Sequence, residues 1–286
     1  MGTKAGTIDS IEIGFYFYWE GRFVLFPFIL AGLVLATAAG VLLELAKWQI
    51  VWAGLLLWAA GILASLLLYA LVLLIVSLFL PTDRPPKRDH PFCRRVTTAT
   101  MGLLCKLMRI RIQATGLDQL PQDTPFLLVC NHRSNLDPLI AAWLLRRYPM
   151  TFVMKPQILK FPIAGPFAFQ SGYIPIDREN DRAALKSILR AVAEIKNDDL
   201  SIGIFPEGTR NHDEGLLPLR NGAFKIAQKA QVPIVVARLD GVDAAARNFP
   251  LRATRVQFAI RQVLPYATFA SRTTAEIGET VCEFMR

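Results

Sequence analysis

Two long apolar stretches dominate the first 80 residues of the chain. Residues 23–43 and 48–82 contain no charged side chain, and only residues 44–47 separate them. A helix of roughly 20 apolar residues crosses a bilayer. Each stretch is therefore long enough to cross once, and the second is longer than one crossing requires. We expect residues 1–80 to form a membrane hairpin of two transmembrane helices, at about 23–43 and 50–80.

The residues around these stretches predict an orientation. Aromatic side chains at 16–19 and 48–52 occupy places typical of the membrane interface. The segment after the second stretch is rich in Lys and Arg, so the positive-inside rule puts both ends of the hairpin in the cytoplasm. A cleaved signal peptide is the alternative, because residues 36–38 read Ala-Thr-Ala. The segment before them carries acidic residues, whereas a signal peptide begins with basic ones.

The pattern changes after a proline-rich, charged linker at residues 81–91. Residues 92–110 are amphipathic, which fits an interfacial helix or the first core helix. From Gly116 onward, short apolar runs alternate with segments of helical spacing. This alternation predicts that residues 92–286 form an α/β domain with a mostly parallel sheet flanked by helices. The expected strands are 126–130, 151–154, 173–176, 200–205, 232–239 and 255–263, and the expected helices are 136–147, 183–196 and 222–230.

Charge and cysteine content narrow the class of partner. The chain has a net charge of +9, and residues 81–286 hold 29 of its 32 Lys and Arg against 19 of its 23 Asp and Glu, a net +10. A basic domain after membrane helices suits an anionic leaflet and acidic substrates. The basic residues form no tract, which argues against nucleic acid. The four cysteines lack zinc-like spacing, so we expect free, mostly buried thiols.

The first candidate for chemistry follows the expected strand 126–130. His132 stands in a loop there, and Asp137 begins the next expected helix. Imidazole is the usual general base near neutral pH, and a carboxylate on its other ring nitrogen fixes the tautomer. The alternative is structural, because Ser134 and Asp137 have nearly the spacing of a capping box.

Two further segments place arginines after expected strands. Residues 205–210 read Phe-Pro-Glu-Gly-Thr-Arg, in which Gly208 allows a positive φ. Arg210 can hold a phosphate through two parallel hydrogen bonds, unless it pairs with Glu207 in a structural turn. Arg178 follows the strand 173–176, and its alternative is a solvated place in a charged loop. The carboxyl ends of parallel strands meet at one edge of a sheet, where sites usually lie.

These segments, in this order, resemble the glycerolipid acyltransferases, in particular the 1-acylglycerol-3-phosphate acyltransferase family. That family carries N-H-x-x-x-x-D, G-x-x-x-x-x-R, F-P-E-G-T-R and V-P-hydrophobic blocks. The matching segments here are Asn131–Asp137, Gly172–Arg178, Phe205–Arg210 and Val232–Val236. The resemblance covers about residues 115–240. Val236 replaces a second proline that usually ends the fourth block, which puts acyl-chain or acceptor preference in doubt more than activity.

The resemblance implies transfer of a fatty acyl group from acyl-CoA or acyl-carrier protein to the sn-2 hydroxyl of lysophosphatidate, giving phosphatidate. It implies no bound cofactor and no metal. His132 would be the general base and Asp137 its partner. Substrate-binding residues carried over from the family are Arg178, Glu207, Gly208, Thr209, Arg210 and, as a phosphate-side candidate, Lys155.

Several alternatives stay open. Another lysophospholipid, glycerol 3-phosphate or lyso-ornithine lipid are other acceptors for the same chemistry. A catalytically inactive, membrane-tethered lipid-binding protein and a hydrolase are alternatives of other classes. The expected partners are a lysophospholipid, an acyl donor and the membrane, but not nucleic acid. The expected location is a multi-pass membrane protein with its catalytic domain on the cytoplasmic face.

Overall fold

The computed structural model describes residues 29–40, 47–83, 86, 90–177, 180–211 and 215–286. The chain divides into two compact units, residues 1–80 and residues 81–286. Residues 84–85 and 87–89 of the expected linker lie outside the described residues.

The first unit contains two apolar helices, Ile29–Gly40 and α2 (Lys47–Leu78). Residues Trp48–Leu78 have a mean hydropathy of 2.7, and their length and composition suffice to cross a membrane. The two helices approach closely, since a Cβ placed on Gly61 would lie 3.0 Å from the Cα of Gly32. Small residues at such crossings let helix backbones pack together in a bilayer. The remaining residues of the first expected helix and the connector 44–46 lie outside the described part of the chain.

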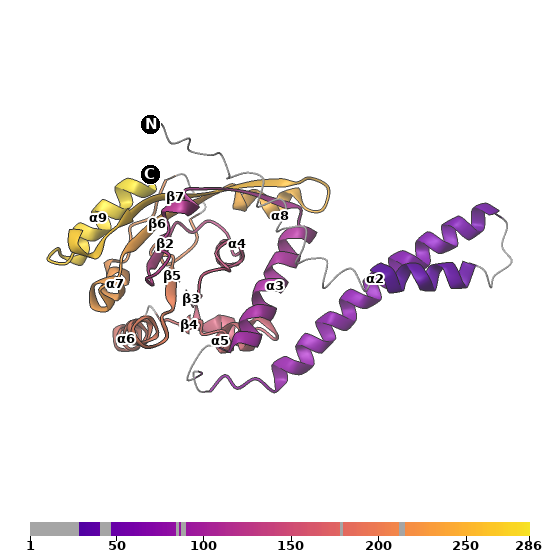
Figure 1. Ribbon diagram of the computed structural model, residues 1–286, viewed down its shortest axis with the longest axis horizontal. Helices are drawn as coiled ribbons and strands as arrows, with labels where there is room; N and C mark the ends of the chain where they lie inside the picture. The colour runs from indigo at the N-terminus through magenta and orange to yellow at the C-terminus, as the bar shows by residue number, and fades with distance from the viewer. Residues whose placement is uncertain (1–28, 41–46, 84–85, 87–89, 178–179, 212–214) are drawn as a thin grey trace, which may run out of the picture. The chain divides into compact units, whose positions relative to one another are not determined.

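A seven-stranded sheet forms the centre of the second unit (Figure 1), in the order β1-β7-β6-β2-β5-β3-β4. The five strands from β6 to β4 are mutually parallel. β7 runs antiparallel to β6 and parallel to β1. The mostly parallel sheet expected from the sequence is therefore confirmed. The strands are β1 (Ile110–Thr115), β2 (Leu127–Cys130), β3 (Met150–Met154), β4 (Ile174–Pro175), β5 (Ser201–Ile204), β6 (Ile234–Asp240) and β7 (Thr254–Leu264).

Helices cover both faces of this sheet. α6, α7 and α9 share one hydrophobic core with strands β2 to β6, because their apolar stripes are buried against the Ile, Leu and Val side chains of those strands. α3 packs against α4 and α5 on the other side of the sheet (Figure 1). The helices are α3 (Pro91–Leu107), α4 (Asp137–Leu144), α5 (Ala164–Gln170), α6 (Asp181–Asp198), α7 (Lys225–Ala230), α8 (Ala245–Asn248) and α9 (Thr274–Met285).

Local sequence signals explain several of these boundaries. Asn180 caps α6 by accepting the N–H of Ala183, and Thr273 forms a capping box with Glu276 at the start of α9. β1, α5, α8 and α9 are not predicted by the pattern of apolar and polar positions. β1 is a short edge strand in which only Ile110 is buried and the other five side chains are half-buried or exposed, so its apolar signal is weak. The expected helix 222–230 is divided, since residues Asn221–Phe224 form a 3-10 turn before α7.

The topology brings four loops to one edge. Because β2, β5, β3 and β4 are parallel, the segments that follow them leave the sheet at the same end. These segments begin at Asn131, Phe205, Lys155 and Ile176. β6 also ends at this edge, and β7 and β1 begin there, because they run in the opposite direction. The candidate residues that the structure describes, His132, Lys155 and residues 207–210, therefore lie in segments that leave the sheet at the carboxyl edge of the parallel strands.

Candidate active site

His132 and Asp137 are in direct contact. His132 Nδ1 lies 2.9 Å from Asp137 Oδ2. The Asp137 side chain is 1% exposed and the His132 side chain 15% exposed, so the imidazole is open to a ligand and its partner is not. The described residues provide no hydrogen-bond partner for Nε2. An ionised Asp137 accepts the Nδ1 proton, which leaves Nε2 unprotonated and able to take a proton from a substrate.

The Asp137 carboxylate also organises the loop between β2 and α4. Its Oδ2 accepts the backbone N–H groups of Arg133 at 2.6 Å and Ser134 at 2.7 Å. The Ser134 hydroxyl instead accepts the N–H of Leu136 at 3.3 Å, so only half of a capping box forms. The two interpretations of the spacing thus combine. Asp137 braces the start of α4 and holds His132 with the same oxygen.

Glu207 joins the two signature segments. Its Oε1 accepts the backbone N–H of His132 at 2.7 Å, and its Oε2 accepts the backbone N–H of Leu217 at 3.1 Å. The side chain is buried. In the described part of the chain Glu207 therefore binds backbone groups and makes no ion pair with Arg210. The Asn211 N–H donates to the His132 carbonyl at 2.7 Å, a second link between these loops.

Asn131 fixes the base of the His132 loop. Its amide donates to the Leu239 carbonyl at 2.9 Å, and its side-chain oxygen accepts the Leu239 N–H at 2.7 Å. Asn131 is buried and extends the pairing of β2 with β6 past the last strand pair, Cys130 with Ala237. This role of Asn131 was not predicted, although the residue precedes His132 in the N-H-x-x-x-x-D block.

An aromatic column supports the imidazole from one side. The ring of Phe205 lies 4.6 Å from the His132 ring, and Phe152 stacks on Phe205 at 6.4 Å between ring centroids. Tyr173 continues the column at 5.8 Å from Phe152. Gly203 makes room for it, since a Cβ at that position would lie 2.3 Å from a ring carbon of Phe152. The column gives the imidazole an apolar neighbour on one side. Of the three aromatic residues, only Phe205 is a specified residue of a motif that the sequence singled out, as the first residue of F-P-E-G-T-R.

The cationic candidates surround the same edge. Gly208 has φ +76°, and its N–H bonds the Phe205 carbonyl at 3.1 Å, which closes the tight turn expected after β5. The turn leaves Thr209 and Arg210 exposed. Lys155 follows β3 and is also exposed. Arg178 lies outside the described residues, immediately after Asp177 beyond β4.

The cysteines match the expectation of free thiols. Cys93, Cys105 and Cys130 are buried and Cys282 is half-buried, and all four are unpaired. Cys130 lies two residues before His132. Burial raises the pKa of its thiol well above the usual range, and the negative charges of Asp137 and Glu207 raise it further. A thiol held protonated in this way is a poor nucleophile. The described residues contain no cluster of three or more His, Cys, Asp or Glu suited to a metal ion.

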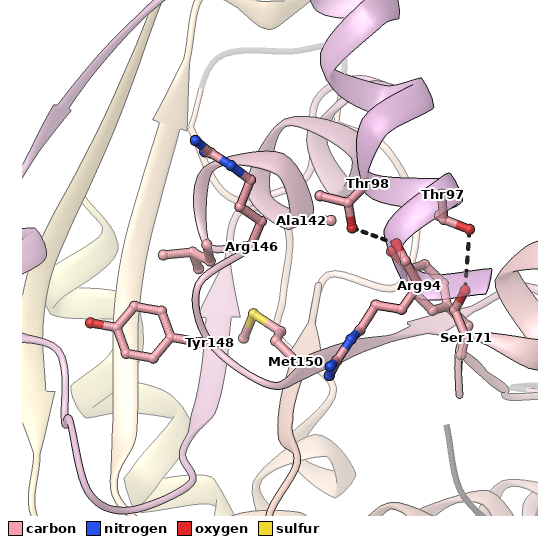
Figure 2. A pocket seen from close by; sticks show the side chains of 10 residues that line it. Arg94, Thr97, Thr98, Ala142, Arg146, Tyr148, Met150 and Ser171 are labelled. Carbon is pink, nitrogen blue, oxygen red and sulfur yellow. Dashed lines mark hydrogen bonds between the residues drawn. The ribbon is translucent and has the colours of Figure 1, made fainter. Parts of the chain in front are cut away.

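A small hollow lies at the opposite end of the sheet (Figure 2). Its lining includes Arg94, Thr97 and Arg146 as well as Met150, the first residue of β3. Several of its hydroxyls are already bonded, for example Thr97 to Ser171 at 3.1 Å. Figure 2 also shows the two guanidinium groups pointing in different directions. His132 follows the far end of β2, so this hollow is separate from the candidate active site.

The second unit is similar to known acyltransferases in sequence and in fold. Residues 111–239 match the family model described as Acyltransferase. The fold resembles the crystal structure of the 1-acyl-sn-glycerophosphate acyltransferase PlsC from Thermotoga maritima, with a TM-score of 0.53 and 21% identity. That match covers 76% of this chain and 85% of that one.

Curated proteins with higher sequence identity to this chain are named 1-acyl-sn-glycerol-3-phosphate acyltransferases. The chain is 37% identical over 133 residues to a putative 1-acyl-sn-glycerol-3-phosphate acyltransferase of Caenorhabditis elegans, which covers 46% of each protein. It is 36% identical over 164 residues to the human 1-acyl-sn-glycerol-3-phosphate acyltransferase alpha, covering 57% of each. The chain thus spans about half the length of the curated relatives it matches.

Proposed function

We propose that this protein is an O-acyltransferase that moves a fatty acyl group from a thioester to the sn-2 hydroxyl of lysophosphatidate. The observation that carries the proposal is the 2.9 Å contact between His132 Nδ1 and Asp137 Oδ2 at an edge that also presents Arg210 and Lys155. The names of the relatives support lysophosphatidate as the acceptor.

The geometry fits direct transfer. The acceptor hydroxyl gives its proton to His132 Nε2 as its oxygen attacks the thioester carbonyl carbon. Asp137 stabilises the imidazolium that forms. The tetrahedral intermediate then expels the thiolate, which receives the proton from Nε2. The products are the acylated lipid and the free thiol. The raised pKa of the buried Cys130 thiol argues against a covalent acyl-enzyme at this residue.

The acceptor phosphate would bind the exposed cations. Arg210 suits two-point binding of a phosphate, and Lys155 supplies a second positive charge from the neighbouring strand. Arg178 has the same role by its place in the sequence. The donor is acyl-CoA or acyl-carrier protein, and catalysis requires no metal or cofactor.

The lysolipid acceptor and the acylated product are membrane lipids, which supports a reaction at the membrane surface. We propose that the hairpin of residues 1–80 anchors the protein as a multi-pass membrane protein, with residues 92–286 on the cytoplasmic side. The helix Trp48–Leu78 supports one crossing, and the excess of basic residues after it supports this orientation.

The test is turnover of the purified full-length protein with labelled acyl donor and a panel of lysolipids. We expect labelled phosphatidate from lysophosphatidate, and loss of about 10²–10⁴-fold of the rate in His132→Ala. Asp137→Asn should lose a comparable amount, because Nδ1 then lacks its anionic partner. Unchanged turnover in His132→Ala would refute the mechanism.

The same assay separates the rivals. Acylation of another lysolipid but not lysophosphatidate would keep the chemistry and change the acceptor. Release of free fatty acid without an acceptor would identify a hydrolase. Lipid binding with no turnover would identify an inactive tethered protein.

A further inference from the structure

The segment between α8 and β7 is a turn that hydrogen bonds hold in place and that exposes apolar side chains. We call residues 248–252 the Phe249 turn. Phe249 is 48% exposed and Leu251 83% exposed. The Arg252 N–H closes the turn on the Asn248 carbonyl at 2.8 Å. The guanidinium of Arg109 donates to the carbonyl oxygens of Leu251 at 2.9 Å and Pro250 at 3.4 Å. The turn therefore displays apolar side chains on a braced backbone.

Arginines surround this turn. Arg247 has a side chain that is 76% exposed, and its ion pair with Asp243 among the described residues is a long contact of 3.5 Å. Arg111 and Arg255 are register partners on the adjoining strands β1 and β7, so they lie side by side. The exposed arginines at or beside the turn are Arg109, Arg111, Arg247, Arg252 and Arg255.

The Phe249 turn lies on the same edge of the sheet as His132. It follows the end of β6 and precedes the start of β7, and these strands are antiparallel. Leu239, near the end of β6, is bonded to Asn131, the residue before His132. The C-terminal end of α3 reaches this edge as well, where Leu107 is exposed. Figure 1 shows α8 and the C-terminal end of α3 near one another.

We propose that the Phe249 turn is a second membrane contact, which inserts Phe249 and Leu251 into the interface of an anionic bilayer while the surrounding arginines bind lipid phosphates. Apolar side chains flanked by basic ones are the composition of interfacial anchors, and arginine binds phosphate in two-point geometry. A protein partner needs roughly 800 Å² on each side, more than a five-residue turn offers, whereas a bilayer accepts single side chains.

A membrane contact at the Phe249 turn would orient the domain relative to the bilayer. This contact would turn the His132 edge of the domain toward the lipid. This last consequence rests on the proposed acyl transfer to a lysolipid, but the contact itself does not. It would shorten the path between a lipid in the bilayer and the active site.

The experiment places an environment-sensitive NBD fluorophore on the turn. The full-length protein, with Leu251→Cys in a Cys282→Ser background, is labelled and reconstituted into phosphatidylcholine nanodiscs with or without phosphatidylglycerol. Nitroxide-labelled lipids then report contact by quenching. The matched control is Ala267→Cys, an exposed position beyond the other end of β7, about 35 Å away at the usual rise of a strand.

We expect a blue shift and strong quenching at position 251 in anionic nanodiscs, and neither at position 267. Adding Arg247→Glu and Arg252→Glu should lower the ratio of docked to undocked protein by at least about fivefold for each residue changed. A solvent-like, unquenched signal at position 251 would overturn the proposal. So would quenching that ignores both charge reversals, or a shift that appears only when an acidic carrier protein is added.

A separate activity assay distinguishes the two proposals. Phe249→Ser with Leu251→Ser should raise the KM for lysolipid presented in anionic vesicles and leave the kcat unchanged. Quenching without any acyl transfer would reject the proposed function and keep the membrane contact. Acyl transfer with no quenching would reject the contact and keep the function.

Discussion

The Glu207 carboxylate accepts the backbone N–H of His132, 75 positions earlier in the chain, at 2.7 Å. Its second oxygen accepts the N–H of Leu217. The resemblance to the acyltransferase family places Glu207 in the substrate pocket, and the structure gives it bonds to protein backbone on both oxygens. Glu207 is therefore suited to position the loop that carries His132 rather than to touch the acceptor.

Glu207→Gln provides the test of this role. The amide keeps one acceptor and turns the other oxygen into a donor that faces a backbone N–H. We expect kcat to fall by about 10²-fold, because small displacements of a catalytic group cost that much. Stability should fall by about 1–3 kcal/mol, since a buried N–H loses its partner. The control is Glu279→Gln on the exposed face of α9. A raised KM for the lysolipid with unchanged kcat and stability would show instead that Glu207 binds substrate.

Substitution of Arg210 or Lys155 should change the KM for the acceptor rather than kcat or stability. Both are exposed, so their removal leaves the fold intact. Arg210→Ala should raise the KM for lysophosphatidate by about 10- to 100-fold, the range of a charged hydrogen bond, with a smaller rise for Lys155→Ala. Lys229→Ala removes a cation at the other edge of the sheet and serves as the control. Equal KM values for Arg210→Ala and Lys229→Ala would remove Arg210 from the phosphate site.

We expect that position 203 cannot accommodate even the methyl group of alanine. Its Cβ would lie 2.3 Å from a ring carbon of Phe152, which supports Phe205 and through it His132. Gly203→Ala should destabilise the protein by about 1–3 kcal/mol through overpacking and lower kcat. Gly222→Ala is the control, because a Cβ added at that position would meet no atom of the described residues within 4 Å. Thermal unfolding compares the two variants. Similar unfolding midpoints for Gly203→Ala and Gly222→Ala would contradict the prediction.

The Cys130 thiol should be unreactive toward alkylating reagents. Burial raises the pKa of its thiol, so the reactive thiolate is scarce at pH 8, and its fraction grows only as the pH rises toward that pKa. We expect N-ethylmaleimide to modify the half-buried Cys282 well before Cys130, as mass spectrometry can follow. Cys130→Ala should keep most of its turnover at a cost in stability of about 1 kcal/mol. Loss of all turnover, with the fold retained, would reopen a covalent mechanism.

The parts of this protein that were predictable from sequence are those that local chemistry dictates. The long uncharged stretch ending near Leu80 predicted the apolar helix α2, and the alternation of strand and helix periods predicted the mostly parallel sheet. His132 and Asp137 were predictable as a pair because five positions separate them. Phe205–Arg210 was predictable as a sharp turn because of its proline and glycine.

The tertiary structure decided what these residues do to one another. The spacing of Ser134 and Asp137 left helix capping and catalysis open, and in the structure one carboxylate oxygen of Asp137 accepts the Ser134 N–H and contacts His132 Nδ1. The partners of Glu207, the clamp from Asn131 to Leu239 and the aromatic column beside His132 join residues from separate strands. Sequence periodicity reports which face of an element is apolar, but not which strands become neighbours. Only the order of β2, β5, β3 and β4 in the sheet brings the segments after them to one edge, where they form a site.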